Sequence, residues 1–551
     1  MTSHCATKPD LVETVQASII GHEAMIETAY GLKPLVYADY GASGRMSALV
    51  EDQLAAQAAL YANPHNEDSM TGQAATSALH QAYSDIKTSL NAHEDHVLIA
   101  CANGATAAIA KLQEILGVAC PPATRALIEA NMKDCLASWL GKSAPVIFIG
   151  PYEHHSNELS WRESLAETVT IGLDETGALD LEDLAQQLSD PRFEGRQKIG
   201  AFSAASNVTG VKTDIAGLAR LLHAHNAVLC LDCAASAPYL QIDLSPSDRD
   251  AAPDAVYFSP HKMLGGPGAC GILVIDKSLY PAGLAPTISG GGTVRYVTPN
   301  SHDFIDDIEA RERAGTPGLT QIQRAAAALS LLDQVGWSHI EAIEHDHLEH
   351  VFEAWRETDG IQILGPDGPD QRIGLVSFTL RDEASGLALH PRFVARLLND
   401  LYGIQARAGC SCAGPYGHYL LDLDATKTEQ YREAVLQGYA GLRPGWVRIC
   451  LHWTMSAEER DYIIAAVKHI CRHATRFLSD YEFDLMSGAW TRRDGKQCQL
   501  SSAQRRAKAL STHLREVQEL AIARTPGSVE INLPAAHAEL AAFAGFASAN
   551  G

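Results

Sequence analysis

The stretch of sequence that decides the fold is Asp254-Ala-Val-Tyr-Phe-Ser-Pro-His-Lys-Met-Leu-Gly-Gly-Pro-Gly268. Its first half is a short apolar run that predicts a buried strand, and Ser259, His261 and Lys262 follow before the backbone becomes rich in glycine. A lysine at the end of a buried strand is unfavourable unless its charge is paired, neutralised or removed by a covalent bond. Lys262 is therefore a candidate for a Schiff base with an aldehyde.

A second apolar run, Ala227-Val-Leu-Cys-Leu-Asp232, also ends in an ionisable side chain. The carboxylate of Asp232 is suited to pair with the protonated nitrogen of a pyridine ring. A lysine that bonds an aldehyde cofactor and an acid beside the ring nitrogen are the groups with which proteins hold pyridoxal phosphate (PLP). The two strand ends together predict a PLP site, with Lys262 as the covalent partner and Asp232 at the ring nitrogen.

The size and charge of the chain limit the classes of protein to which it can belong. It has 551 residues, of which 46% are hydrophobic, so two or three domains with a substantial core are expected. A net charge of -23 disfavours nonspecific binding to nucleic acids and to anionic membranes. No apolar run approaches the roughly 20 residues that span a bilayer, and the first residues lack the apolar core of a signal peptide. A cytoplasmic location is expected.

The 12 cysteines are scattered through apolar segments rather than arranged as a disulfide framework, so most are expected to be free thiols. Cys230 and Cys233 have the CxxC spacing of metal and redox sites, but no second pair of ligands accompanies them. No metal ion is therefore expected.

Apolar runs of strand length alternate with segments of helical periodicity from residue 96 onward. This alternation predicts an α/β fold in which helices cover both faces of a mostly parallel sheet. The expected regions are an N-terminal helical segment (1–34), a large PLP-binding domain (35–320), a smaller C-terminal α/β domain (321–478) and a C-terminal extension (479–551).

The turn Ala102-Asn-Gly-Ala-Thr106 stands between a predicted strand and a predicted helix. Amide groups such as that of Ala105, together with the Thr106 hydroxyl, can hold a phosphate group at a helix N-terminus. Ser259 and His261 are expected to add contacts to the same phosphate. A turn of this kind is more often a plain helix cap, and that alternative stays open on these residues alone.

Two further motifs follow predicted strands, Glu153-His-His-Ser-Asn157 and Ser206-Asn-Val-Thr-Gly210. A histidine of the first motif can stack on a pyridine ring and later transfer protons. Asn207 in the second motif can donate a hydrogen bond to the phenolic oxygen of the ring. The alternatives are a histidine with a purely structural role and an ordinary turn, which Asn and Gly favour.

The segment Arg407-Ala-Gly-Cys-Ser-Cys-Ala-Gly-Pro415 carries two cysteines in a loop that is rich in glycine. An accessible thiolate close to an arginine is an activated nucleophile, although two cysteines in an ordinary loop are more often inert. Arg448 lies within the strand pattern Trp446-Val-Arg-Ile-Cys-Leu451. A buried arginine needs a partner, which is either the carboxylate of a substrate or a structural ion pair.

Taken together, these motifs resemble the class V aminotransferase family of fold-type I PLP enzymes, and most closely its cysteine desulfurase and selenocysteine lyase branch. The resemblance runs from about Tyr37 to Ile470. It rests on the motifs at 37–43, 153–157, 206–210, 259–262, 290–292, 314–317 and 407–413. The fold that it implies has a large domain with a mostly parallel sheet and a smaller C-terminal α/β domain.

The resemblance also implies a role for individual residues. By this resemblance, Lys262 bonds the cofactor, and His154 stacks on its ring and moves protons. Cys412 rather than Cys410 forms a persulfide, and Arg448 binds the substrate carboxylate. Ala42 and Asn207 lie beside the substrate, and Thr316 reaches the phosphate bound by the neighbouring subunit. A homodimer with shared active sites is therefore implied, and a sulfur-acceptor protein is a further expected partner.

Three features depart from the family pattern. The segment Asp232-Cys-Ala-Ala235 lacks the glutamine that usually touches the ring hydroxyl, a cysteine-bearing insertion lies around 120–140, and the tail after about residue 478 lies beyond the usual end of the family.

The expected activity is removal of sulfur or selenium from L-cysteine or a related amino acid, which gives alanine through a persulfide on Cys412. One alternative is another class V reaction on a different amino acid, namely transamination, epimerisation, decarboxylation or another PLP-dependent lyase reaction. The other is a non-enzymatic sulfur carrier or partner-binding protein that keeps the fold.

Overall fold

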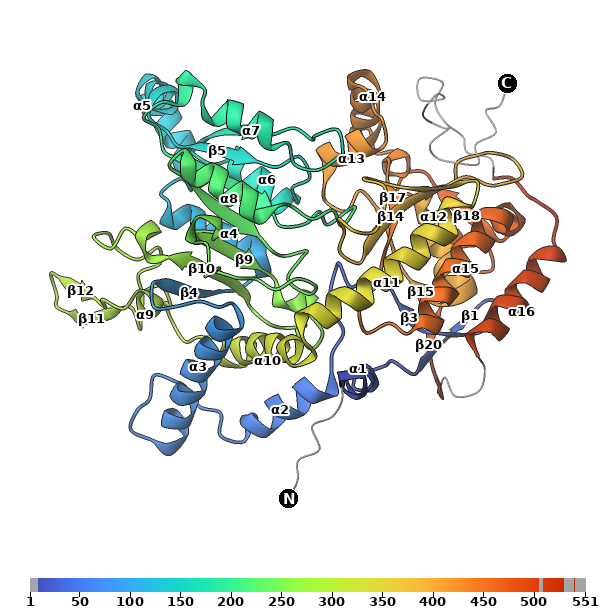
Figure 1. Ribbon diagram of the computed structural model, residues 1–551, viewed down its shortest axis with the longest axis horizontal. Helices are drawn as coiled ribbons and strands as arrows, with labels where there is room; N and C mark the ends of the chain where they lie inside the picture. Colours follow the sequence, from blue (N-terminus) through green and yellow to red (C-terminus); the bar gives the residue numbers. More distant parts are fainter. Residues whose placement is uncertain (1–7, 505–508, 530–539, 541–551) are drawn as a thin grey trace. The chain divides into compact units, whose positions relative to one another are not determined.

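A computed structural model describes residues 8–504, 509–529 and 540, which divide into two compact units (Figure 1). Unit 1 contains residues 1–41, 207–210 and 340–551, and unit 2 contains residues 42–206 and 211–339. The chain thus leaves unit 1 after Gly41, returns to it for the four residues Asn207–Gly210 and re-enters it after His339.

Unit 2 is built on a seven-stranded sheet. Its strands are β4 (His96–Cys101), β5 (Val146–Ile149), β6 (Glu167–Thr170), β7 (Lys198–Ser203), β8 (Ala227–Asp232), β9 (Ala255–Phe258) and β10 (Gly271–Asp276). They lie in the order β4-β10-β9-β8-β7-β5-β6; the strands from β9 to β6 are parallel, whereas β10 is antiparallel to both β9 and β4. The prediction of a mostly parallel α/β sheet is confirmed.

Helices cover this sheet, and the central strands are almost fully buried, as their continuous apolar runs predict. The helices of the region are α2 (Ala48–Ala58), α3 (Met70–Ser89), α4 (Gly104–Ile115), α5 (Pro122–Lys142), α6 (His155–Arg162), α7 (Leu181–Leu188), α8 (Ile215–Ala224), α9 (Ile308–Arg311) and α10 (Leu319–Val335). A hairpin of β11 (Val294–Val297) and β12 (His302–Phe304) precedes α9. The sequence placed the end of the large domain at residue 320, whereas unit 2 also includes α10, because α10 packs along α3.

The direction of the strands determines where the functional side chains lie. Because β10 is antiparallel to both of its neighbours, β4 points the same way as the parallel strands. The carboxyl ends of β4, β5, β7, β8 and β9 therefore share one edge of the sheet, which is where open α/β sheets bind ligands.

Unit 1 has a smaller sheet in the order β13-β14-β17-β16, with all neighbours antiparallel. These strands are β13 (Ile361–Ile363), β14 (Leu375–Leu380), β16 (Arg407–Gly409) and β17 (Trp446–Cys450), and β15 (Ile404–Gln405) pairs with β3 (Val36–Tyr37). The remaining helices are α1 (Lys8–Ala17), α11 (Trp337–Arg356), α12 (Pro391–Tyr402), α13 (Gly414–Leu420), α14 (Ala425–Leu436), α15 (Ala457–His473) and α16 (Leu510–Ile522). One apolar core, which includes Phe378, Phe393 and Tyr462, joins the sheet to α11, α12, α14, α15 and α16.

The N-terminal segment differs from the helix expected over residues 1–34. Within residues 8–34, which the structure describes, α1 is the only helix, whereas Ala24–Thr28 (β1) and Gly31–Pro34 (β2) are strands of an antiparallel hairpin. That part of the prediction is wrong. On its other side β1 pairs with Gln499–Gln504 (β20), a partner so distant in sequence that local periodicity gives no sign of it (Figure 1).

The described part of the C-terminal extension belongs to unit 1. Tyr481–Asp484 (β18) and Ala489–Arg492 (β19) form a hairpin, and Tyr481, Trp490, Leu510 and Val517 are buried in the core of this unit. The Tyr481 hydroxyl donates a hydrogen bond to the buried carboxylate of Asp400 at 2.8 Å. Residues 1–7 and the end of the predicted extension, 530–539 and 541–551, lie outside the described residues.

Among the described residues, no helix combines the length and the apolarity that a bilayer crossing requires.

Candidate active site

Lys262 ends the 3₁₀ turn Pro260–Lys262, which directly follows β9. The segment before α2 holds this turn, because the backbone N–H of Gly44 donates to the carbonyl oxygen of His261 at 2.8 Å. Only glycine fits at position 44, since a Cβ atom there would lie 1.9 Å from the carbonyl oxygen of Met263. Ala42, predicted to lie beside the substrate, stands two residues before this contact.

Asp232 is the last residue of β8, the strand next to β9, and only 5% of its surface is exposed. Its Oδ1 atom accepts a hydrogen bond from the backbone N–H of Ala234 at 2.8 Å. Burial raises the pKa of the Asp232 carboxyl, while this hydrogen bond and the positive charge of Lys262 act in the opposite direction. The predicted acid and the predicted lysine therefore lie close enough to interact electrostatically.

Three residues predicted to hold phosphate meet at the N-terminus of α4. The backbone N–H of Ala105 donates to Oγ of Ser259 at 2.8 Å. A Cβ atom at Gly104 would lie 2.7 Å from the same oxygen and 3.0 Å from Cε1 of His261, so the glycine lets these groups approach closely. Thr106, which is exposed, shares a hydrogen bond of 2.8 Å with Ser156 at the start of α6.

His154 and Thr316 occupy other positions in unit 2. Nδ1 of His154 accepts from the backbone N–H of Ser156 at 3.1 Å, so His154 caps α6. Thr316 is exposed, and its hydroxyl oxygen accepts from the Asn63 side chain at 3.3 Å.

Sequence reasoning missed the buried network around Glu153. This carboxylate accepts from the backbone N–H of Ser203 at 2.9 Å, from the Ser203 hydroxyl at 2.6 Å and from the Asn157 amide at 2.7 Å. Burial outweighs these donors and raises the pKa of Glu153 to about 7, and the charge of Asp232 adds to the increase. Ser203 pairs with Asp232 across β7 and β8, so the network supports the acid at the strand end. Its signal in the sequence was the glutamate that begins the Glu-His-His motif.

Arg448 lies in β17 of unit 1 with 2% of its side chain exposed. One terminal nitrogen donates to the backbone carbonyl of Asn207 at 2.8 Å, and the other pairs with Asp39 at 3.2 Å. Its Nε atom is buried without a hydrogen-bond partner in the part of the chain that the structure describes. Arg407 faces Arg448 across the strand pair and reaches the second oxygen of Asp39 at 3.3 Å. The part played by Asp39, which lies within the Tyr37–Ser43 motif, was not foreseen.

The two-cysteine loop is tied to the same group. The Asn207 amide donates to the carbonyl oxygen of Ser411 at 2.7 Å. Oδ1 of Asn207 and Oγ of Ser411 are also buried, and neither has a hydrogen-bond partner among the described residues. Cys412 is exposed and Cys410 is partly exposed. Asn207, predicted to contact a ring hydroxyl, thus holds the cysteine loop in this structure.

The predicted residues therefore form two groups. Unit 2 holds Ala42, Ala105, Thr106, His154, Asp232, Ser259, His261, Lys262 and Thr316, and unit 1 holds Asn207, Cys412 and Arg448.

The group in unit 2 suits pyridoxal phosphate. The buried carboxyl of Asp232 suits a pyridine nitrogen, and the amine of Lys262, which interacts with it, suits an aldehyde carbon. At the N-terminus of α4, Gly104 has no side chain to separate the backbone from Ser259 and His261. A phosphate group can therefore approach the backbone N–H groups there. In unit 1, Arg448 and Asn207 are joined by a hydrogen bond, and each has one buried atom without a hydrogen-bond partner among the described residues.

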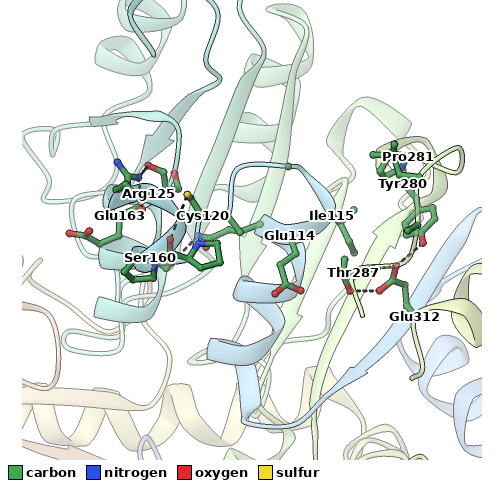
Figure 2. A pocket seen from close by; sticks show the side chains of 18 of the residues that line it. Glu114, Ile115, Cys120, Arg125, Ser160, Glu163, Tyr280, Pro281, Thr287 and Glu312 are labelled. Carbon is green, nitrogen blue, oxygen red and sulfur yellow. Dashed lines mark hydrogen bonds between the residues drawn. The ribbon is translucent and has the colours of Figure 1, made fainter. Parts of the chain in front are cut away.

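A separate pocket of about 700 Å³ in unit 2 is lined by residues from the predicted insertion (Figure 2). Cys120 and Arg125 line it together with Glu114 and Glu163, and Arg125 donates to the carbonyl oxygen of Ser164 at 2.6 Å. None of the predicted catalytic residues is among the described residues that line this pocket.

Comparison with known proteins gives three kinds of match. The family model Aminotransferase class-V matches residues 36–462, which is most of the chain. A probable cysteine desulfurase of Halalkalibacterium halodurans is 31% identical over 284 residues, covering 51% of this chain and 64% of that relative. A probable cysteine desulfurase of Streptomyces coelicolor is 29% identical over 273 residues, covering 49% and 61%. The chain therefore spans less than two thirds of the length of these relatives.

Solved structures extend the likeness to most of the fold. The apo structure of the cysteine desulfurase from Thermococcus onnurineus NA1 aligns with a TM-score of 0.63 at 22% identity and covers 83% of this chain and 98% of its own. The cysteine desulfurase CsdA (S-sulfonic acid) from Escherichia coli aligns with a TM-score of 0.60 at 21% identity, with the same coverage. At such identities the likeness establishes the fold.

Proposed function

This chain belongs to the class V aminotransferase family, and on that basis we propose that it is a PLP-dependent cysteine desulfurase. It would remove sulfur or selenium from L-cysteine or a related amino acid and release alanine. The observation that carries the proposal is the link from Arg448 through Asn207 to the two-cysteine turn. The buried Nε of Arg448, which has no hydrogen-bond partner among the described residues, supports the proposed binding of a carboxylate, and a thiol lies on a turn tied to Arg448.

The residues of unit 2 would hold the cofactor. Lys262 would bond its aldehyde carbon, Asp232 would pair with its ring nitrogen, and Ser259, His261, Ala105 and Thr106 would hold its phosphate. When bound, PLP supplies a sink for the electrons released at the α- and β-carbons of the amino acid. Asp232 would strengthen that sink by favouring the protonated ring nitrogen.

The protein side chains would then perform four tasks. Arg448 binds the substrate carboxylate and fixes the orientation of the amino acid, with Ala42 and Asn207 beside it. The amine of Lys262 would take the α-proton and return a proton to carbon, and His154 would stack on the cofactor ring and transfer protons. The Cys412 thiolate attacks the substrate sulfur. In net terms, L-cysteine and the Cys412 thiol give alanine and a Cys412 persulfide.

The proposal includes the assembly and the location of the protein. A homodimer is proposed in which Thr316 of one subunit contacts the phosphate bound by the other, and the exposure of Thr316 agrees with this role. A sulfur-acceptor protein would take the product sulfur. A cytoplasmic location suits both free thiols and the sulfur chemistry.

The test uses the purified full-length protein with PLP, L-cysteine and a thiol reductant. Sulfide and alanine are measured for the wild type and for Cys412→Ser, Lys262→Ala and Arg448→Lys. Equal amounts of sulfide and alanine are expected from the wild type, with neither from Cys412→Ser and neither from Lys262→Ala.

Two variants sharpen the interpretation. Arg448→Lys should raise KM for L-cysteine about 10- to 100-fold, because it loses hydrogen bonds to a charged group worth about 1.5–3 kcal/mol. The control Cys135→Ser removes an exposed thiol elsewhere and should behave as wild type. Alanine that survives in Cys412→Ser, or no alanine from the wild type, would point instead to another class V reaction.

A further inference from the structure

Cys410 and Cys412 lie at the first and third positions of one tight turn. The backbone N–H of Ala413 donates to the carbonyl oxygen of Cys410 at 3.1 Å, and φ is 50° at Ser411 and 58° at Cys412. A turn closed in this way with two left-handed central residues is a type I′ turn. Residues other than glycine rarely adopt this conformation, so the surrounding structure must hold it.

Contacts on both sides of the turn supply that support. Before it, β16 pairs with β17, with Gly409 opposite Trp446. Within it, the buried Asn207 amide donates to the Ser411 carbonyl oxygen at 2.7 Å. The peptide that joins Ser411 to Cys412 is thereby fixed, and the spacing between the two cysteines is fixed with it.

Both thiols of the turn are open to reaction. Cys412 is exposed and Cys410 is partly exposed, whereas Cys230, Cys233 and Cys450 are buried. Burial raises the pKa of the Cys450 thiol to about 11, which keeps it protonated and unreactive. The turn therefore presents two accessible thiols that only Ser411 separates in sequence, although a single nucleophile is enough to accept one sulfur atom.

We propose that Cys410 is a second catalytic cysteine, which releases the sulfur held on Cys412 as sulfide; this inference rests on the proposed function. The Cys410 thiolate attacks Sγ of Cys412, and the bond between that sulfur and the outer sulfur of the persulfide breaks. The outer sulfur leaves as hydrosulfide, and a disulfide joins Cys410 to Cys412.

The step balances without an external oxidant. The outer sulfur is reduced to hydrosulfide, the Cys410 sulfur is oxidised by the same amount, and the Cys410 proton passes to solvent when the thiolate forms. A small thiol or dithiol reductant must then reduce the disulfide before the next turnover. On this route the sulfur leaves as free sulfide in the absence of the sulfur-acceptor protein.

The geometry of the turn permits the disulfide. Two residues that are two positions apart have Cα atoms no farther apart than about 7 Å even in an extended chain. A turn shortens that distance, and disulfides join Cα atoms about 4.4–6.8 Å apart. The left-handed conformation of the intervening Ser411 bends the backbone in the sense that brings the ends together.

The test follows one turnover of the full-length protein with PLP and limiting L-cysteine, with no reductant present. Alanine and free sulfide are quantified, and the tryptic peptide 408–427, which contains Cys410 and Cys412 and no other cysteine, is weighed by mass spectrometry. The wild type should release sulfide equal to alanine, and its peptide should be lighter by two hydrogen atoms.

The variants separate this inference from the proposed function. Cys410→Ser should form as much alanine as the wild type, release at least tenfold less sulfide and yield a peptide heavier by one sulfur atom. Cys135→Ser, a matched loss of an accessible thiol, should match the wild type. Wild-type protein that forms alanine yet keeps the extra sulfur on its peptide would overturn the role of Cys410 and leave the desulfurase intact. No alanine at all from the wild type would overturn both.

Discussion

The side-chain amide of Asn207 donates a hydrogen bond to the carbonyl oxygen of Ser411, and the two atoms lie 2.7 Å apart. Through its own carbonyl oxygen, Asn207 accepts from Arg448 at 2.8 Å. One residue thus links the proposed carboxylate site to the turn that carries Cys410 and Cys412. Other groups of unit 1 hold its neighbours, because Ser377 donates to the carbonyl oxygen of Val208 at 2.6 Å.

Replacement of Asn207 by alanine should loosen the cysteine turn. The hydrogen bond to Ser411 is worth about 0.5–1.5 kcal/mol net, so the rate at which iodoacetamide modifies Cys412 should change about two- to tenfold. Peptide mass spectrometry over time measures that rate. Asn131→Ala, in the exposed helix α5, is the matched control and should leave the rate unchanged. An unchanged rate in Asn207→Ala would show that the cysteine turn keeps its conformation without the hydrogen bond from Asn207.

The substitution Gly44→Ala should displace the lysine turn. Its Cβ atom would lie 1.9 Å from the Met263 carbonyl oxygen, which is backbone and cannot move aside freely. We expect PLP affinity to fall at least tenfold, as measured by titrating the absorbance of the bound cofactor. Gly141→Ala is the control, because a Cβ atom at Gly141 meets nothing within 4 Å. Equal affinities for the two variants would contradict the proposed place of Lys262.

Glu153 should make the stability of unit 2 depend on pH. Because burial raises its pKa from 4.5 to about 7, the folded protein binds this proton more tightly than the unfolded chain. Its contribution to stability is therefore full below pH 4.5 and is lost as the pH rises through 7, a loss of about 3 kcal/mol.

Glu153→Gln removes that dependence, so over this pH range the variant should gain about 3 kcal/mol relative to the wild type. The free energy of unfolding in urea at several pH values measures the difference. Glu163→Gln controls for the loss of one negative charge at an exposed site. A difference between Glu153→Gln and the wild type that stays constant with pH would refute the role of the glutamate.

The C-terminal hairpin should be essential to the stability of unit 1. Trp490 is 5% exposed, and its indole N–H donates to His390 at 3.1 Å. Trp490→Ala should lower the free energy of unfolding by about 3–5 kcal/mol, as large aromatic deletions in cores do. Denaturant unfolding measures this, with Trp139→Ala, at a position 39% exposed, as the control. Comparable small losses in both variants would mean that the hairpin merely covers the surface.

Local patterns of apolar and polar residues predict some parts of the fold. Continuous apolar runs predicted β8 and β9, and the polar residues that close them predicted the pair Asp232 and Lys262. The family model and the solved structures confirm the family and the fold. In contrast, the pairing of β1 with β20 and the position of Asp39 between two arginines depend on contacts between distant segments. Periodicity does not encode such contacts.

The site shows the same division. Motif residues such as Ser259 and Ala105 are found together because strand ends place them on one edge. The hydrogen bond from the Asn207 amide to Ser411 was not foreseen, since the sequence does not indicate which carbonyl oxygen an amide on a turn will bind. Glu153 belongs to the motif at 153–157, but its raised pKa follows from burial that only the folded chain reveals.

The order of the segments along the chain determines which parts can fold first during synthesis on the ribosome. Unit 2 lies entirely within residues 42–339, so all of its chain is made before the last two hundred or so residues of the protein emerge. Strand β1 pairs with β2 at once, but its other edge waits for β20 at Gln499–Gln504. At about 5–20 residues per second that wait lasts on the order of a minute. During it, the nascent chain carries an open strand edge on β1, which is a template for unwanted pairing with other chains.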